Sequence, residues 1–183
     1  MPPHADQHLE ERILKAAQRL WKTRGERGLT LRAVAKEAGT TTPTVYKRFR
    51  NKQALLSALA ARFRQQLNEQ LFTAKTVPEI YGLYLKFAEQ HPHEYQLLMH
   101  SWADIFHPDH PAPGRVWFMH QLARRFGGAP EDYDRAFYAF LLLAHGASSM
   151  LCVPSDEASR NVIRRNFYAV ADSLLKNIKI LRV

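Results

Sequence analysis

The sequence has 183 residues, a single cysteine and a net charge of +9. A chain of this length can bury a hydrophobic core, as one compact unit or as a small and a medium domain. The lone Cys152 excludes an internal disulfide, no apolar run is long enough to span a membrane, and the first twelve residues, MPPHADQHLEER, lack the apolar core of a signal peptide. We therefore expect a soluble, cytoplasmic protein.

The excess positive charge lies entirely in the first 76 residues. Residues 1–76 contain 15 Lys and Arg against 6 Asp and Glu, whereas residues 77–183 contain 11 of each kind. A basic segment of this kind favours a nucleic-acid partner, because neutralising its phosphates releases counterions. A basic surface kept for solubility is the alternative, and it explains the charge but not its segregation.

The first predicted element is an amphipathic helix over residues 8–24, after a short arm at residues 1–7 that we expect to be disordered. Its apolar residues recur at intervals of three and four: Ile13, Ala16, Ala17, Leu20 and Trp21. The opposite face carries Lys and Arg and is interpreted as a solvated surface. The helix is therefore expected to pack beneath the elements that follow.

Residues 30–56 have the pattern of two short helices joined by a tight turn, with a third helix directly after them. Thr30 suits the N-cap of the first helix, and Gly39 supplies the positive φ that ends it. Thr41 can cap the second helix, whose Pro43 falls in the first turn, where a missing N–H costs little. The spacing predicts a helix-turn-helix.

The second of these helices has a polar outer face. Val45 and Phe49 are expected to point back into the core, which leaves four side chains outward: Thr42, Thr44, Tyr46 and Lys47. Hydroxyls, an aromatic ring and a base suit the acceptors, donors, thymine methyls and phosphates along the edge of a DNA duplex. The sequence therefore predicts a DNA-recognition helix.

The stretch GLTLRAVAKEAGTTTPTVYKRFRNKQALLSALA resembles the DNA-binding signature of TetR-family bacterial transcription regulators over its whole length and without gaps. The shared features are the Gly-Leu-Thr entry, the Ala-Gly turn, the Tyr-x-x-Phe helix and the Asn-Lys-x-x-Leu start of a long connecting helix. The resemblance implies a three-helix DNA-binding module followed by a helical domain that binds a ligand and dimerises.

The resemblance also implies which side chains meet DNA. Arg32 occupies a position at which the family commonly reads a guanine, and its guanidinium fork suits that base edge. Thr30 and Lys52 match positions that clamp phosphates and so position the protein without specifying sequence. The base- and phosphate-contacting positions of the recognition helix correspond to Thr42, Pro43, Thr44, Tyr46 and Lys47.

After the motif, Asn51 is expected to cap a fourth helix over residues 51–72, and the basic bias ends near residue 76. We therefore predict a helix-turn-helix domain with its connecting helix at 1–76 and a helical domain at 77–183. Proline and glycine divide the second domain into five predicted helices, roughly 78–90, 93–106, 114–127, 131–151 and 156–179. No strand pattern is visible, so the predicted fold is all-α with about nine helices.

Two segments of the C-terminal half, FAEQHPHEYQLLM and LLLAHGASSML, resemble the C-terminal domain of a TetR subgroup. This subgroup is marked by a Trp, a His-Gly pair and a His-Pro-x-x-Tyr segment. His145-Gly146 and His91-Pro92 with Tyr95 match these features. Leu141 stands where the subgroup has its Trp, so a ligand specific to the subgroup does not follow.

The resemblance further implies a small-molecule inducer bound between the middle helices, which carry aromatic and apolar faces. Faces of this kind more often belong simply to the core. The ligand-binding candidates are Tyr84, Phe87, Met99, Trp102, Phe106, Trp117, Gln121, Phe137 and Leu141.

The last two predicted helices each keep one apolar face over several turns and form the predicted dimer interface. Two such helices from each subunit can build a four-helix bundle about a twofold axis, as a palindromic DNA site requires. The alternative is that both faces close the core of the monomer. The interface candidates are Phe140, Ala144, Ala147, Leu151, Ile163, Phe167, Val170 and Leu174.

Metal and enzyme functions have little support in the sequence. His100, Asp104 and His107 share a helix face with His110 close behind, but the spacing is loose and no Cys joins them, so we expect surface histidines and no metal. The chain lacks a GxSxG elbow and a phosphate-cradling glycine loop. We therefore expect no enzyme activity and no cofactor.

The predicted function is a ligand-responsive transcriptional regulator, a repressor by resemblance. It is expected to bind a palindromic operator as a homodimer and to be released by a small, largely apolar inducer. The alternative is a basic structural or nucleoid-type protein that binds duplex DNA without an inducer and without a strong preference for one site.

Overall fold

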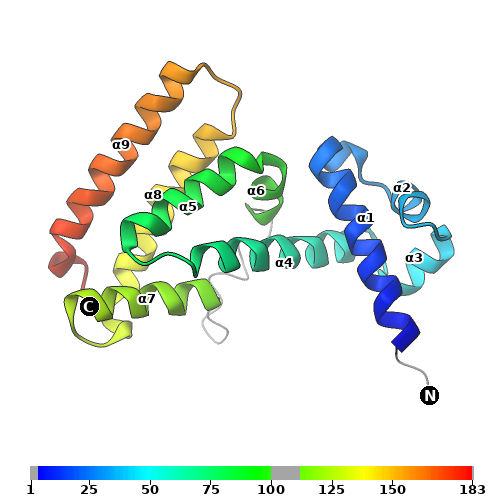
Figure 1. The fold of residues 1–183 in the computed structure, drawn as a ribbon, viewed down its shortest axis with the longest axis horizontal. Coiled ribbons are helices and arrows are strands. Elements are labelled where there is room, and N and C mark those ends of the chain that lie inside the picture. The colour runs from blue at the N-terminus through cyan, green and yellow to red at the C-terminus, as the bar shows by residue number, and fades with distance from the viewer. Residues whose placement is uncertain (1–3, 100–111, 183) are drawn as a thin grey trace. The chain divides into compact units, whose positions relative to one another are not determined.

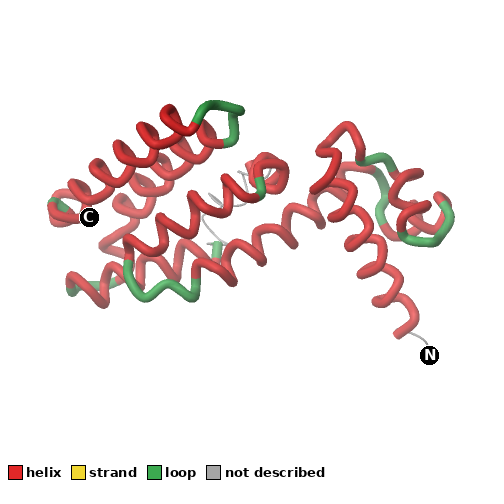
Figure 2. Tube along the Cα trace, turned by 45° about the horizontal axis from the view of Figure 1, so that its top comes forward, coloured by secondary structure: helices red, strands yellow, loops and turns green. Residues whose placement is uncertain are grey.

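The computed structural model describes residues 4–99 and 112–182, with side chains from residue 8 onward. Every regular element in these ranges is a helix, as Figure 1 and Figure 2 show. The predicted all-α fold is therefore confirmed. Among these helices, none is both long and apolar enough to cross a lipid bilayer.

Nine α-helices and two short 3-10 helices follow one another along the described chain. The α-helices are α1 (His4–Gly28), α2 (Leu31–Glu37), α3 (Thr42–Arg48), α4 (Lys52–Leu71), α5 (Val77–Gln90), α6 (Pro92–Met99), α7 (Pro113–Phe126), α8 (Asp134–Leu151) and α9 (Glu157–Lys176). The 3-10 helices are η2 (Pro130–Tyr133) and η3 (Ile178–Leu181).

The contacts between residues divide the described chain into two compact units. The first unit consists of residues 4–65 and 93–99, and the second consists of residues 66–92 and 112–182. The first unit therefore contains α1 to α3, most of α4, and also α6, which rejoins it from further along the chain. The functional boundary near residue 76 rests on charge and stays a prediction.

A core of apolar side chains holds the first unit together. Ile13 and Trp21 of α1, Val34 of α2, Val45 of α3 and Leu59 of α4 are all at most 4% exposed. Full burial of a side chain of this size contributes roughly 1.5–3 kcal/mol. Ile13, Trp21 and Val45 are among the core positions that the sequence predicts.

Several helix boundaries differ from the sequence prediction. α1 extends to Gly28, beyond the predicted end at residue 24, and contains a break at Gly25, which has φ +58° and ψ −153°. The predicted helix at 131–151 begins with the separate turn η2, and α9 ends at Lys176 before η3 follows. Of the predicted helix at 93–106, only α6 lies within the described residues. Short 3-10 turns at helix ends satisfy backbone groups without leaving a periodic apolar pattern in the sequence.

An aromatic cluster forms the centre of the second unit, where α5, α8 and α9 lie side by side (Figure 1). Tyr81 of α5 stacks on Phe140 of α8 with ring centroids 5.0 Å apart, and it meets Phe167 of α9 edge-on at 5.9 Å. Phe118 of α7 lies 5.7 Å from Phe140 and 6.0 Å from Phe137. Aromatic pairs in such geometries add about 0.5–1.5 kcal/mol beyond area burial, so the cluster fixes four helices against one another.

The end of the described chain is tied to the segment between α7 and α8. Arg182 pairs with Asp132 at 2.6 Å, and its guanidinium lies over the ring of Tyr133, 5.4 Å from the centroid. Tyr133 in turn donates a hydrogen bond to the carbonyl of Gly127. The hydrogen bond from Arg182 holds the pKa of Asp132 below its ordinary value.

Candidate nucleic-acid interface

The first helix of the motif begins and ends as its sequence predicts. The Thr30 hydroxyl oxygen accepts a hydrogen bond from the backbone N–H of Ala33 at 3.1 Å and so caps α2. Gly39 has φ +63°, and the N–H of Thr40 donates a hydrogen bond to the carbonyl of Ala35 at 2.9 Å. This left-handed residue turns the chain at once toward α3.

The second helix of the motif is also capped by a threonine. The Thr41 hydroxyl oxygen accepts from the backbone N–H of Thr44 at 3.4 Å and lies 2.8 Å from the Thr44 hydroxyl. Pro43 falls in the first turn. Val45 and Phe49 are 0% and 5% exposed, so they anchor α3 in the core of the unit and leave its other face outward.

The predicted DNA-contacting residues all lie on the motif and on the start of α4. Tyr46 is 53% exposed, an unusual environment for an aromatic side chain without a partner surface. Asn51 caps α4 by accepting a hydrogen bond from the N–H of Ala54 at 2.8 Å, which sets the position of Lys52. Five of the eight candidates are exposed, namely Thr30, Arg32, Pro43, Tyr46 and Lys47, and three are half-buried, namely Thr42, Thr44 and Lys52.

Ion pairs fix the helices that carry the motif. Arg62 of α4 donates from Nη1 to both carboxylate oxygens of Glu11 in α1, at 2.9 and 2.7 Å, and from Nε to Gln18 at 2.8 Å. Arg19 of α1, interpreted from the sequence as a solvated residue, donates to Glu37 of α2 at 2.8 Å. The hydrogen bonds from Arg62 lower the pKa of Glu11. Sequence reasoning missed these pairs because their partners are far apart in the chain.

α6 packs against α1 within the first unit, which the sequence did not predict. The indole N–H of Trp21 donates to the backbone carbonyl of His93 at 2.7 Å, and Lys22 Nζ lies 3.5 Å from the carboxylate of Glu94. Glu94 is only 4% exposed, and a carboxylate at such a depth requires a partner. A Cβ at Gly25 would come within 3.3 Å of His93 Nδ1, so glycine leaves room for the His93 ring.

The predicted ligand-binding residues are distributed over both units. Phe87 and Phe137 are buried, and Phe137 is part of the aromatic cluster. Trp117 meets Phe72 with centroids 5.2 Å apart, and Met99 falls in the first unit. Five of the candidates are half-buried, namely Tyr84, Met99, Trp117, Gln121 and Leu141. The candidates Trp102 and Phe106 lie outside the described residues.

The predicted dimer-interface residues lie mostly in the chain's own core. Ile163 and Leu174 are half-buried, and only Val170 is exposed, at 46%. The other five are at most 8% exposed, namely Phe140, Ala144, Ala147, Leu151 and Phe167. Besides Val170, the exposed large apolar side chains of α8 and α9 are Leu142, Met150, Val162 and Tyr168, none of which was predicted at the interface.

The histidines of the described residues do not gather with other potential metal ligands. Within this part of the chain there is no group of three His, Cys, Asp or Glu side chains that could hold a metal ion. The set of His100, Asp104, His107 and His110 lies outside it. His145 interacts within its own helix, where its Nε2 lies 3.5 Å from the Ser149 hydroxyl, and partial burial lowers its pKa.

Two short capped helices, a left-handed turn between them and an exposed polar face in a basic unit define a helix-turn-helix DNA-binding protein. Residues 13–59 match the sequence model of the bacterial regulatory proteins of the tetR family. The matched residues contain the helix-turn-helix, so this part of the chain is similar to the DNA-binding domain of that family. No curated protein matches the sequence.

Solved structures of TetR-family regulators have the same fold over nearly the whole chain. A regulator from Haemophilus influenzae RD is 22% identical, with a TM-score of 0.55 over 91% of this chain and 98% of that one. One from Streptomyces coelicolor is 18% identical, with a TM-score of 0.60 over 93% and 96%. A possible regulator from Streptomyces coelicolor A3(2) is 18% identical, with a TM-score of 0.62 over 94% and 99%.

Proposed function

We propose that this protein is a ligand-responsive repressor that binds a palindromic operator as a homodimer and is released by a small, largely apolar inducer. The observation that carries the proposal is the outer face of α3. It exposes Tyr46 and Lys47 beside the Thr42 and Thr44 hydroxyls, while Val45 ties the helix to its core. An aromatic ring, hydroxyls and a base on one short helix offer direct contacts to base edges and phosphates.

The proposed release mechanism uses α4 as a rigid connection. α4 runs from Lys52 to Leu71 without proline or glycine, so no residue within it readily absorbs a displacement. A tilt at residues 63–71 is therefore expected to move the motif and to change the spacing of the two recognition helices, which must stay near ~34–36 Å. The inducer must bind the displaced state more tightly, and operator DNA must weaken inducer binding by the same factor.

Two buried hydroxyls in the second unit support a ligand with at least one polar atom. Tyr81 is 3% exposed and Ser148 is fully buried, and neither hydroxyl has a hydrogen-bond partner among the described residues. Leaving such a group unpaired costs about 1–3 kcal/mol, which a ligand or a water molecule would recover. Burial raises the pKa of Tyr81, so its hydroxyl stays a donor at neutral pH.

The proposed dimer uses the outer faces of the last two helices. On α8, Leu142, Gly146 and Met150 are exposed at intervals of four residues and so lie on one face. On α9, Val162 and Val170 are exposed apolar side chains. Two copies of these faces would form a four-helix interface about a twofold axis.

The recognition-helix assignment is tested with duplexes recovered from fragmented genomic DNA by the purified protein. Replacing Tyr46 and Thr44 together with Ala should remove roughly 1–3 kcal/mol of the preference for the recovered sequence over scrambled duplexes. Lys52→Ala should weaken binding to all duplexes and flatten the salt dependence, because Lys52 is assigned to phosphate. Lys176→Ala, an exposed lysine of α9, is the control and should change neither property.

An unchanged footprint in the Tyr46 and Thr44 double variant would contradict the recognition-helix assignment. Equal affinity of the unmodified protein for recovered and scrambled duplexes would instead support the alternative, a structural DNA-binding protein without sequence preference. A sequence-specific regulator is expected to differ by a factor of roughly 10³ or more between the two kinds of duplex.

A further inference from the structure

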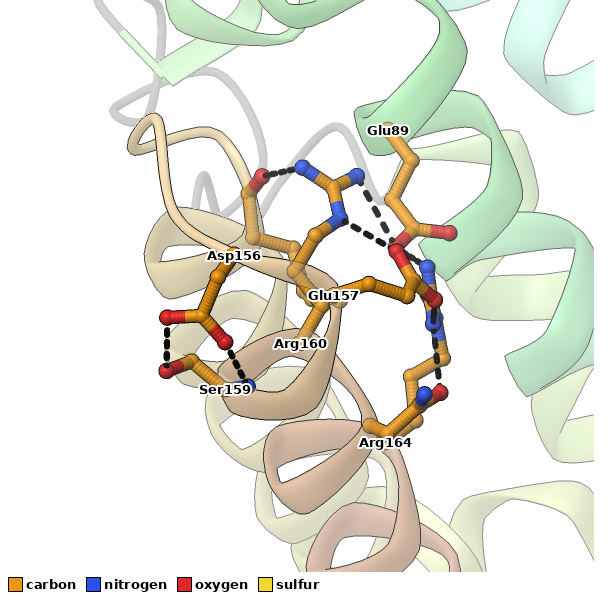
Figure 3. Close-up of polar contacts among 8 residues, drawn as sticks. Glu89, Asp156, Glu157, Ser159, Arg160 and Arg164 are labelled. Carbon is orange, nitrogen blue, oxygen red and sulfur yellow. Dashed lines mark hydrogen bonds and ion pairs between the residues drawn. The ribbon is translucent and has the colours of Figure 1, made fainter.

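A charged cluster joins the end of α5 to the start of α9 in the second unit (Figure 3). Glu89, in the last turn of α5, accepts hydrogen bonds at one carboxylate oxygen from Arg164 Nη2 at 2.6 Å, Arg164 Nε at 3.0 Å and Arg160 Nη2 at 3.2 Å. Both arginines belong to α9, so the three residues lie within one compact unit. We call these three residues the Glu89 cluster.

Further contacts hold the two arginines in place. Arg164 Nη1 donates to Glu157 at 2.7 Å and to Asn161 at 2.9 Å, so one guanidinium bridges α5 and the start of α9. Arg160 Nη1 lies 3.4 Å from the carbonyl of Leu151, the last residue of α8. The planar guanidinium donates in several directions at once, which an ammonium group on a flexible stem does less well.

The position of Glu89 makes these partners necessary. A carboxylate in the last turn of a helix meets the negative end of the helix dipole, which disfavours its charge. The Glu89 side chain is only 17% exposed, so water screens its charge less than at the surface. Removing the arginines would leave this charge without compensation, and the attraction between the three side chains therefore holds the start of α9 on α5.

The two halves of α9 are held on the unit by different interactions. In residues 157–166, all of which the structure describes, no side chain is buried. The half-buried side chains of this first half include a single apolar one and both arginines of the cluster, namely Ile163, Arg160 and Arg164. In residues 167–176, three apolar side chains are buried, namely Phe167, Ala171 and Leu175. The first half of α9 therefore depends on charge, whereas the second half depends on apolar burial.

We propose that the Glu89 cluster orders the first half of α9, and that this order is required for a second copy of the chain to bind tightly. Val162 belongs to this half, is 49% exposed and is one of the residues assigned to the dimer surface above. If the first half of α9 were loose, dimer formation would have to order it, at a cost in affinity. The effect on the dimer rests on the function proposed above, whereas the effect on α9 does not.

The first test compares the full-length protein with its Glu89→Gln variant, which keeps the side chain's shape and removes its charge. Hydrogen exchange followed by mass spectrometry reports separately on residues 157–166 and 167–176. We expect about tenfold faster exchange in the first segment and a change of less than about twofold in the second. Arg164→Gln should act in the same direction, and the double variant should do little more than either single variant. The proteins are compared at concentrations at which they have the same oligomeric state.

Salt gives a second readout, which a loss of packing would not produce. Raising the ionic strength from about 0.1 to 1 M shortens the Debye length from ~10 to ~3 Å, so it weakens partly exposed ion pairs and leaves apolar burial in place. In the unmodified protein, this change should speed exchange of residues 157–166 by roughly threefold or more relative to residues 167–176. The Glu89→Gln variant has already lost the attraction between α5 and α9 and should show a smaller salt dependence.

The dimer dissociation constant is measured by sedimentation velocity over a dilution series. Glu89→Gln and Arg164→Gln should each raise this constant by about fivefold or more, because the second copy must then order the first half of α9 as it binds. The matched control is Asp132→Asn, which breaks the Arg182 pair elsewhere in the same unit. It should change neither the exchange nor the dissociation constant. Thermal unfolding followed by circular dichroism verifies that all variants fold, and the salt experiment on the unmodified protein requires no variant.

Exchange of residues 157–166 that stays within about twofold of the unmodified protein in both variants would overturn the proposal. Faster exchange with an unchanged dissociation constant would overturn the role in dimer formation and leave the proposed homodimer intact. Monomers of the unmodified protein would instead contradict the homodimer, and the exchange rates would still decide whether the Glu89 cluster orders α9.

Discussion

Asp156 is the N-cap of α9 and makes the start of that helix sensitive to pH. Its carboxylate accepts hydrogen bonds from the backbone N–H of Ser159 at 2.8 Å and from the Ser159 hydroxyl at 2.9 Å. These hydrogen bonds, the backbone one first, lower the pKa of Asp156 below its ordinary value of 3.8. The cap therefore stabilises the fold fully above that value and loses its contribution as the pH falls through the lower, folded-state pKa.

We predict that Asp156→Ala lowers the melting temperature at pH 7 by a few degrees, because two hydrogen bonds at the helix start are lost. The gap between the variant and the unmodified protein should narrow as the pH falls below about 3.8. Thermal unfolding across this pH range measures both effects. Asp156→Asn keeps an acceptor without the charge and should show a smaller loss with little pH dependence; a loss as large as that of Ala would contradict the capping argument.

Single side chains were predictable where the interaction is local. Thr30, Thr41 and Asn51 cap α2, α3 and α4 as predicted, since a cap bonds to an N–H only two or three residues away. The Glu11–Arg62 pair was not predictable by the same means. Its two partners are 51 residues apart, and only the packing of α1 on α4 brings them together.

At the scale of the helices, two glycines can be compared directly, Gly39 in the turn of the motif and Gly146 within α8. Gly39 has φ +63°, and the space around its Cα is open, as it is around Gly146 within α8. Gly39→Ala should lower the free energy of unfolding by about 1–2 kcal/mol, because only the backbone conformation opposes a side chain there. Gly146→Ala should raise it by roughly 0.5–1 kcal/mol, since alanine is the better helix former.

Urea denaturation followed by circular dichroism measures both glycine variants under the same conditions. Opposite signs are the expected outcome, because within one copy of the chain neither variant meets a steric clash and the two positions differ in backbone conformation. A stabilising effect of Gly39→Ala would mean that the turn between α2 and α3 does not require a left-handed residue.

For the chain as a whole, the proposed twofold assembly leads to a clear test of the outer face of α8. Leu142 and Met150 are each 61% exposed, whereas Ile180, which is 73% exposed, belongs to η3 and not to α8. Light scattering of the unmodified protein at micromolar concentration should give a dimer. Leu142→Glu or Met150→Glu should give monomers, because a carboxylate cannot be buried there without a partner.

Ile180→Glu is the matched control for this experiment and should remain dimeric. Monomers of the unmodified protein would contradict the homodimer itself. A dimer that survives both α8 substitutions would instead place the interface elsewhere on the surface.

The sequence by itself determined the helical class, the helix-turn-helix and its caps, and the segregation of positive charge. Each of these features depends on composition or on residues within one or two helical turns of each other. The sequence alone is therefore sufficient to predict them. Only the tertiary structure decided which apolar helix faces are buried in the chain's own core. Phe140 and Phe167 have the same periodic spacing that an interface would have, yet both pack against Tyr81.

The docking of α6 on α1 and the pairing of Glu89 with Arg160 and Arg164 were likewise decided only by the tertiary structure. Glu89 and Arg164 are 75 residues apart, and Trp21 and His93 are 72 apart. A polar residue in a helical pattern is compatible with solvent, with a cap or with a distant partner, and periodicity does not distinguish them. Which of these environments a polar residue has depends on the free energy of packing whole helices. That packing brings together charged residues that are far apart in the sequence.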